Sequence, residues 1–163
     1  MKKLETINLK GNLYAKVAAR IKLFREDTVR GDISTEQIFN PDGTMTFKTT
    51  IIADRSDEHS KRSTGHATKK IVGEKDSEKL ETISTGRALA NLGYLASGDV
   101  ASFEEMEDFY KFKDDKKQEV IKKLQACKNV DELKKVFLGL GDLMADKDVI
   151  EAKDKTKECL KCK

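Results

Sequence analysis

The sequence predicts an α+β protein, with an antiparallel three-stranded β-meander packed against helices and a helical C-terminal extension. Three segments with the two-residue alternation typical of strands follow one another between residues 32 and 72. Apolar residues at helical spacing lie before and directly after them, and again through the last third of the chain. The order α-β-β-β-α, followed by helices, places a core domain at residues 1–110 and a helical extension at 111–163.

The first helix is expected from Leu13 to Phe24, because Leu13, Val17, Ile21 and Phe24 fall on one face. Gly31 ends this pattern. Three strands are then expected: Asp32–Phe39, Thr44–Ala53 and Ser63–Val72. The turn NPDG joins the first two strands, since proline sets the φ angle of a type I turn and glycine closes it. The polar residues 54–63 form a loop.

A second long helix is expected to end near Tyr94, with Ser77 as its N-terminal cap and acidic residues in its first turns. Ser102 and Glu105 have the spacing of a capping box and predict the start of the next helix. The segment YKFKDDKK, residues 110–117, is interpreted as a hinge or linker, with helix continuation as the alternative. The remaining residues are expected to be helical.

The composition is that of a charged, water-soluble chain. Charged residues make up 37% of its 163 residues, and no apolar run approaches the roughly 20 residues of a membrane span. No signal peptide is recognised after the first lysines, so a cytoplasmic protein is expected. Of three cysteines, Cys159 and Cys162 form CLKC, half of a zinc site, with no second ligand pair nearby. Reduced thiols, with no metal and no cofactor, are therefore expected.

Motifs of catalysis are sparse. The sequence contains no GxGxxG, Walker, HExxH or GxSxG motif and only two histidines, so a non-enzymatic protein is expected. The alternative is a metal-dependent nuclease that uses Asp54, Asp57 and Glu58. A solvated acidic loop accounts for these three residues more simply.

Basic residues in the first part of the chain indicate nucleic-acid binding. Residues 1–102 carry 17 basic and 14 acidic residues, which is the whole net charge of +3. A phosphate-tracking groove is expected from these cations, with Phe47, Tyr14 or Tyr94 available for base stacking. The alternative is that the lysines only confer solubility. The cations concerned are Lys16, Arg20, Lys48, Lys61, Arg62, Lys69, Lys70 and Arg87.

Gly86 and Arg87 lie at the centre of ISTGRALANLG, among residues with small side chains. Small side chains let a helix backbone approach a sheet or another helix closely, and Gly86 is expected at the tightest point. Arg87 would then reach past a thin layer to solvent, a phosphate or a neighbouring subunit. The alternative is a structural ion pair with a carboxylate such as Glu81.

The segments LKGNLYAKVAARIKLFRED, DGTMTFKTTI, TGHATKK and above all ETISTGRALANLGY resemble phage single-strand annealing proteins of the Erf type. The resemblance covers roughly residues 9–110. It implies a β-β-β-α annealing core that assembles into rings or filaments, holds single-stranded DNA in a basic groove and pairs complementary strands without ATP. A phage-encoded protein of this kind would act in the host cytoplasm.

On this basis the protein is expected to bind and anneal single-stranded DNA in recombination. The alternative is a non-catalytic interaction or regulatory module that keeps the annealing fold and binds a protein partner through its C-terminal helices. The expected DNA-binding residues are Lys69, Lys70 and Arg87 first, then Lys48, Lys61, Arg62, Arg20 and Phe47.

Overall fold

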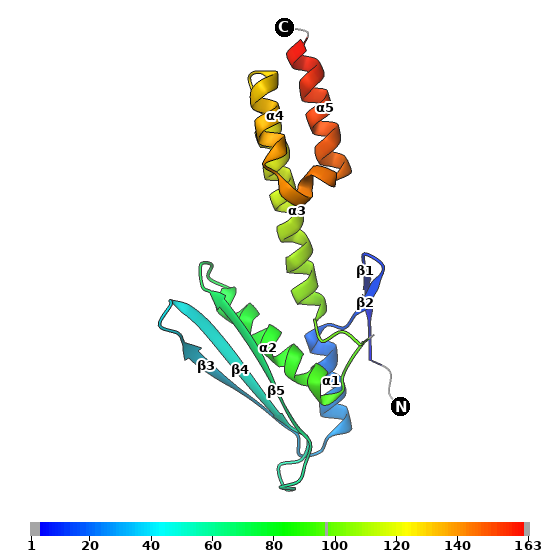
Figure 1. Ribbon diagram of the computed structural model, residues 1–163. Coiled ribbons are helices and arrows are strands. Elements are labelled where there is room, and N and C mark those ends of the chain that lie inside the picture. The colour runs from blue at the N-terminus through cyan, green and yellow to red at the C-terminus, as the bar shows by residue number, and fades with distance from the viewer. Residues whose placement is uncertain (1–3, 97, 162–163) are drawn as a thin grey trace. The chain divides into compact units, whose positions relative to one another are not determined.

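The computed structural model describes residues 4–96 and 98–161. Its chain forms two compact units, Met1–Glu107 and Asp108–Lys163. The first unit contains β1 (Ile7–Leu9), β2 (Asn12–Tyr14), α1 (Val17–Asp27), β3 (Asp32–Phe39), β4 (Thr44–Ile52), β5 (Arg62–Lys70) and α2 (Asp76–Leu92) (Figure 1). Helix α3 (Phe103–Gln125) begins there and continues into the second unit, which adds α4 (Val130–Leu138), the 3-10 helix η1 (Gly141–Ala145) and α5 (Lys147–Lys161). The predicted α+β class is confirmed.

The predicted meander is confirmed as an antiparallel sheet of order β3-β4-β5. Its register places Lys48 between Glu36 and His66, and Thr44 opposite Lys70. The NPDG turn forms as expected: the Gly43 amide donates to the Asn40 carbonyl at 3.1 Å, and Gly43 has a φ of +78°. Each strand boundary lies within two residues of the predicted one.

Helix α2 packs on one face of this sheet (Figure 1). The residues of β4 alternate between buried and partly exposed, as expected when one face is covered. Ile51 packs with Phe24, Ala88 and Leu89, and a second cluster joins β4 and β5 to α2. This second cluster consists of Phe47, Ala67 and Leu80.

Gly65 and Gly86 allow α2 to approach its neighbours closely. A Cβ atom on Gly65 of β5 would lie 2.3 Å from the Ser84 carbonyl oxygen and 2.4 Å from the Ala88 nitrogen. A Cβ atom on Gly86 would lie 2.7 Å from Cγ2 of Val17. The helical cost of Gly86 is therefore offset by close packing of α2 against α1. Gly86 lies at a tight contact as expected, but α2 approaches its neighbours more closely at Gly65, so the expectation that Gly86 marks the tightest point is confirmed only in part.

The first helix begins four residues later than predicted. Leu13 and Tyr14 belong to a two-stranded hairpin, in which Leu13 pairs with Asn8. Lys10 and Gly11 form its turn with positive φ angles, and the Gly11 amide donates to the side chain of Asn8 at 3.0 Å. A short hairpin of this kind has too few residues for the periodicity of its sequence to be distinguished from a helix.

Helix α2 begins at Asp76 and not after Ser77, so that predicted cap is wrong. The carboxylate of Asp76 accepts hydrogen bonds from the amides of Val72 and Gly73, at 3.0 and 2.8 Å. These bonds fold the loop before the helix back onto its first residue. The Ser102 cap of α3 is confirmed, because the Glu105 amide donates to Oγ of Ser102 at 3.3 Å.

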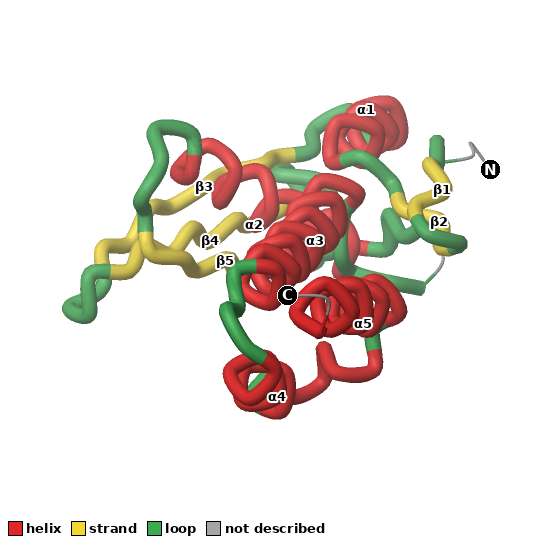
Figure 2. Tube along the Cα trace, turned by 90° about the horizontal axis from the view of Figure 1, so that it is seen from above, coloured by secondary structure: helices red, strands yellow, loops and turns green. Residues whose placement is uncertain are grey.

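The second unit is a helical assembly with its own core, which centres on Leu124, Leu133 and Val149. Residues 110–117 are helical within α3, so their interpretation as a hinge is wrong and the alternative holds. Asn129 caps α4 by accepting a hydrogen bond from the Glu132 amide at 2.8 Å. Figure 2 shows α4 and α5 end-on beside each other, joined by η1, and Figure 1 shows that they run in opposite directions. Cys159 is exposed, whereas Cys162 lies outside the described residues.

Candidate nucleic-acid interface

The sheet of the first unit has one face that points away from α2. We call it the outer face. Because side chains alternate along a strand, its members follow from the register. From β3 it includes Asp32, Ser34, Glu36 and Ile38; from β4, Thr44, Thr46, Lys48, Thr50 and Ile52; from β5, Arg62, Thr64, His66, Thr68 and Lys70. All five residues from β5 are exposed, and those from β4 are partly exposed.

Three predicted DNA-binding cations, Lys48, Arg62 and Lys70, lie on this outer face. Arg62 and Lys70 mark the two ends of β5, about 26 Å apart at the usual rise per residue. Lys48 lies on the central strand, opposite His66. Among the described residues, none of these three cations forms an ion pair, whereas Asp32 on β3 is paired with Arg55 at 3.6 Å. Both carboxylates of the outer face, Asp32 and Glu36, belong to β3, so the β4–β5 side is its basic side.

Hydroxyl groups fill the space between these cations. Thr46 and Thr68 are hydrogen-bonded through their Oγ1 atoms at 2.8 Å, and the side chain of Asn40 donates to both Thr44 and Thr46. Threonine hydroxyls and lysine and arginine side chains are the groups that contact phosphate and sugar in nucleic-acid complexes. This surface is mainly polar, and Ile38 and Ile52 are its apolar members.

Lys69 and Lys61 lie elsewhere. Lys69 points to the side of α2, where its Nζ forms an ion pair with Asp76 at 2.9 Å. The amide of Gly73 and the Lys69 ammonium hold the pKa of Asp76 well below its usual range. Lys61 is exposed in the loop that leads into β5, one residue from Arg62. Lys61 is therefore adjacent in sequence to Arg62 of the basic side. Lys69 instead stabilises the loop before α2 through its ion pair with Asp76.

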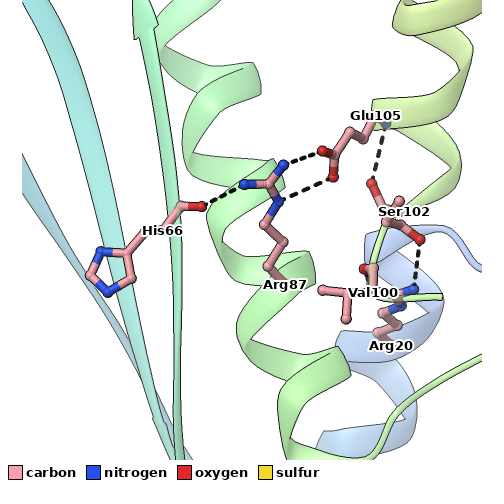
Figure 3. Close-up of polar contacts among 7 residues, drawn as sticks. Arg20, His66, Arg87, Val100, Ser102 and Glu105 are labelled. Atoms are coloured by element: carbon pink, nitrogen blue, oxygen red, sulfur yellow. Dashed lines mark hydrogen bonds and ion pairs between the residues drawn. The ribbon is translucent and has the colours of Figure 1, made fainter. Parts of the chain in front are cut away.

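Arg87 is held in a structural network (Figure 3). Its guanidinium group contacts both carboxylate oxygens of Glu105, with an Nε–Oε2 distance of 3.3 Å, and it donates to the His66 carbonyl at 2.9 Å. The alternative of a structural ion pair is thus found, with Glu105 as the partner. Glu81, the partner considered from the sequence, instead accepts a hydrogen bond from Thr35 at 2.6 Å.

Arg20 is fully buried, so it is not part of an exposed basic surface. Its guanidinium group donates to the carbonyls of Gly86, Val100 and Ala101 at 2.7, 2.9 and 3.0 Å. Burial lowers the pKa of Arg20, while the nearby Glu104 and Glu105 oppose that shift. Sequence periodicity places this arginine on the polar side of α1, but its carbonyl partners come from segments about 66 to 81 residues away.

The aromatic residues predicted to stack on bases instead pack within the protein. Phe47 is 7% exposed and packs beneath α2, which removes it from any surface contact with DNA. Tyr14 is buried, and Tyr94 packs edge-on against Phe24 with ring centroids 5.9 Å apart. In β4 the aromatic ring and Lys48 are consecutive residues, so they point to opposite faces. None of the predicted stacking residues therefore lies on the outer face, whose one aromatic ring is the exposed imidazole of His66.

The charge of the two units differs from the sequence expectation. Met1–Glu107 contains 17 basic and 17 acidic residues, and Asp108–Lys163 contains 15 basic and 12 acidic ones. The difference arises because Glu104, Glu105 and Glu107 belong to the first unit. Two of these glutamates have partners within the unit: Glu105 accepts a hydrogen bond from Arg87, and Glu104 accepts one from the Val17 amide. The local distribution of cations, and not the net charge, distinguishes the outer face.

No protein-family model, curated protein or solved structure matches the chain. The described residues contain no cluster of three or more histidine, cysteine, aspartate or glutamate side chains arranged to hold a metal ion. None of the helices in the described ranges has the length and apolar character needed to cross a membrane.

Proposed function

We propose that the first unit binds single-stranded DNA on its outer face, and that the protein promotes annealing of complementary strands without ATP and without catalysis. The observation that supports this function is the placement of Lys48, Arg62 and Lys70 on an open, hydroxyl-rich sheet face, free of ion pairs with described residues. The resemblance of the GRAL helix and the preceding meander to annealing proteins agrees with this proposal.

The chemistry of the outer face suits binding through the DNA backbone. Lysine and arginine side chains neutralise phosphates and release counterions, while threonine hydroxyls donate to phosphate oxygens. Because Phe47 and Tyr14 are buried and Tyr94 packs against Phe24, we expect this face to hold the strand mainly by its phosphates, with the bases directed away from the sheet. Bases held in that way keep their pairing edges available to a second strand.

The test is fluorescence anisotropy of a labelled oligonucleotide, titrated at several salt concentrations. The triple variant Lys48→Ala/Arg62→Ala/Lys70→Ala should bind more weakly. The magnitude of its slope of log K against log salt should fall by about 2, since each phosphate contact with a single strand contributes about 0.7. The control variant Lys22→Ala/Lys75→Ala/Lys122→Ala makes the same charge change at exposed lysines that are not part of the outer face. Equal affinities of the two variants, or no binding by the unmodified protein at low salt, would disprove this interface.

Annealing is tested separately with two complementary oligonucleotides that carry a fluorophore and a quencher. The unmodified protein should accelerate quenching without ATP, and the outer-face triple variant should lose most of that acceleration. Binding without acceleration would keep the interface and reject annealing. Assembly into rings or filaments belongs to the same proposal and is measured by light scattering with and without the oligonucleotide.

A further inference from the structure

A groove of about 310 Å³ lies between α4 and α5 in the second unit. Leu133, Phe137 and Leu138 supply apolar lining from α4, and Lys134, Lys153 and Lys157 surround them with positive charge. No carboxylate lines the groove among the described residues. Its volume is at the lower end of the range of ligand pockets, about 300–1,000 Å³. It therefore suits one or two bulky side chains.

Helical spacing explains how the groove forms. Leu133 and Phe137 are four residues apart on α4, and Lys153 and Lys157 are four residues apart on α5, so each pair lies on one face of its helix. The turn through η1 brings α4 and α5 side by side (Figure 1), and the two pairs line one groove between them. Leu133 is 2% exposed and belongs to the core of the unit, whereas Leu138 is 70% exposed. The apolar lining of the groove thus extends from the buried core of the unit to the solvent-exposed surface.

The positive charges of the lysines lie close to the apolar lining of the groove. The ammonium group of Lys153 lies 4.9 Å from the centroid of the Phe137 ring, within the range of a cation–π contact. Lys153 also pairs with Asp154 at 2.9 Å. Lys134 and Lys157 are exposed and have no ion pair with any described residue. Two unpaired cations and one ring-bound cation thus surround an apolar depression.

We propose that this groove binds an acidic peptide segment of a partner protein, in which a bulky apolar side chain has carboxylates on both sides. The apolar side chain would enter the groove between α4 and α5, above Leu133 and against Phe137 and Leu138. The carboxylates would meet the ammonium groups of Lys134 and Lys157. Charge complementarity selects this occupant, because three lysines and no carboxylate line the site. A nucleic acid would not use the apolar lining that reaches the core. This proposal does not depend on DNA binding by the first unit.

The test uses the full chain and a fluorescein-labelled peptide, DDFLDD, with DDSSDD and KKFLKK as comparison peptides. DDFLDD should bind the most tightly of the three. The charge-reversal variant Lys134→Glu/Lys157→Glu should weaken DDFLDD binding by about tenfold or more, which corresponds to about 1.4 kcal/mol. Leu138→Ser should also weaken it, although Leu138 is too exposed to be needed for folding. The control Lys122→Glu/Lys147→Glu reverses the same charge at exposed positions that do not line the groove.

Several outcomes would overturn the proposal. Equal binding of DDFLDD and DDSSDD would show a purely electrostatic surface. Unchanged affinity in the charge-reversal variant would place the peptide elsewhere. A shift of that variant to a smaller assembly, measured by light scattering, would identify a second copy of the chain as the occupant. The sheet variant Lys48→Ala/Arg62→Ala/Lys70→Ala should retain peptide binding, so failure of the DNA proposal and failure of this one give different results.

Discussion

At the scale of single residues, two arginines attach the segment after α2 to the rest of the first unit. Arg20 donates from α1 to the carbonyls of Val100 and Ala101, and Arg87 contacts Glu105 from α2. The amide of Phe103 also donates to the Ala15 carbonyl at 3.1 Å. The beginning of α3 is thus fixed by polar contacts, which are more directional than apolar packing.

Replacing Arg87 should affect stability and not DNA affinity. Arg87→Ala removes the contacts to Glu105 and His66 and should lower the free energy of unfolding by about 1 kcal/mol, because the pair is partly exposed. Urea denaturation measures this loss, and oligonucleotide anisotropy should give an unchanged affinity per folded molecule. Arg87→Lys keeps the charge without the planar fork and should restore only part of the stability. Weaker DNA binding at unchanged stability would instead place Arg87 at the interface.

The sequence predicted part of the candidate site at this scale. Lys48 and Lys70 could be assigned to a sheet surface because strand alternation determines the face from local sequence alone. Arg62 was expected in the loop 54–63 but is the first residue of β5. Arg20 could not, since its burial depends on carbonyl groups far away in the chain. His66 and the threonines of the outer face were not selected, although their alternation in RSTGHATKK was visible.

At the scale of elements, the N-terminal end of α2 is fixed by one carboxylate. Asp76 accepts hydrogen bonds from two amides of the preceding loop and pairs with Lys69 from β5. These contacts join the end of the last strand, the loop and the first turn of the helix. A negative charge at this position also interacts favourably with the helix dipole.

Asp76→Asn should make the protein less stable near neutral pH but not in acid. The pKa of Asp76 is lowered in the folded state, so its stabilisation is present above the unfolded pKa, near 4, and is lost as pH falls toward the folded value. Thermal melting should therefore show a lower midpoint for Asp76→Asn at pH 7, with a difference that shrinks as pH decreases below about 4. Glu74→Gln, at an exposed neighbouring position, is the control. A difference that stayed constant with pH would exclude a role for the ionised carboxylate.

The ends of helices and strands could be predicted where a single hydrophobic repeat, that of a strand or that of a helix, continues over enough residues. The three strands alternate over eight or nine residues each, and their ends came close to prediction. Leu13 fits both a helical face and a three-residue strand, so local pattern could not separate α1 from the preceding hairpin. The charged segment 110–117 has few apolar residues to show a helical period, and the hinge interpretation failed for that reason.

At the scale of the whole molecule, the chain has separate hydrophobic cores. Leu124, Leu133 and Val149 belong to a cluster formed within the second unit, whereas Phe24, Ile51 and Leu89 cluster in the first. No described residue is shared between these clusters. Separate cores allow parts of a protein to open at different free energies.

Leu124→Ala should destabilise the second unit selectively. Leu124 is fully buried, and truncation of such a side chain costs about 2–5 kcal/mol. Native-state hydrogen exchange should show faster exchange of amides in α4 and α5, while amides of β4 keep their protection. The matched variant Ile51→Ala removes a fully buried side chain from the first unit and should give the reverse pattern. Equal acceleration throughout the chain in both variants would show a single cooperative unit.

The two edge strands of the main sheet differ in how open they are. This difference limits how many copies of the protein could join by adding strands to the sheet. At the β5 edge, Arg87 and Asn91 of α2 already occupy the carbonyls of His66 and Thr64, the latter at 2.8 Å. At the opposite edge, β3 is exposed from Ser34 to Phe39. If strands add only at the β3 edge, two sheets can join edge to edge and no further sheet can follow. Strand addition of that kind would end at a pair, and a ring or filament of this protein would then be built through other surfaces.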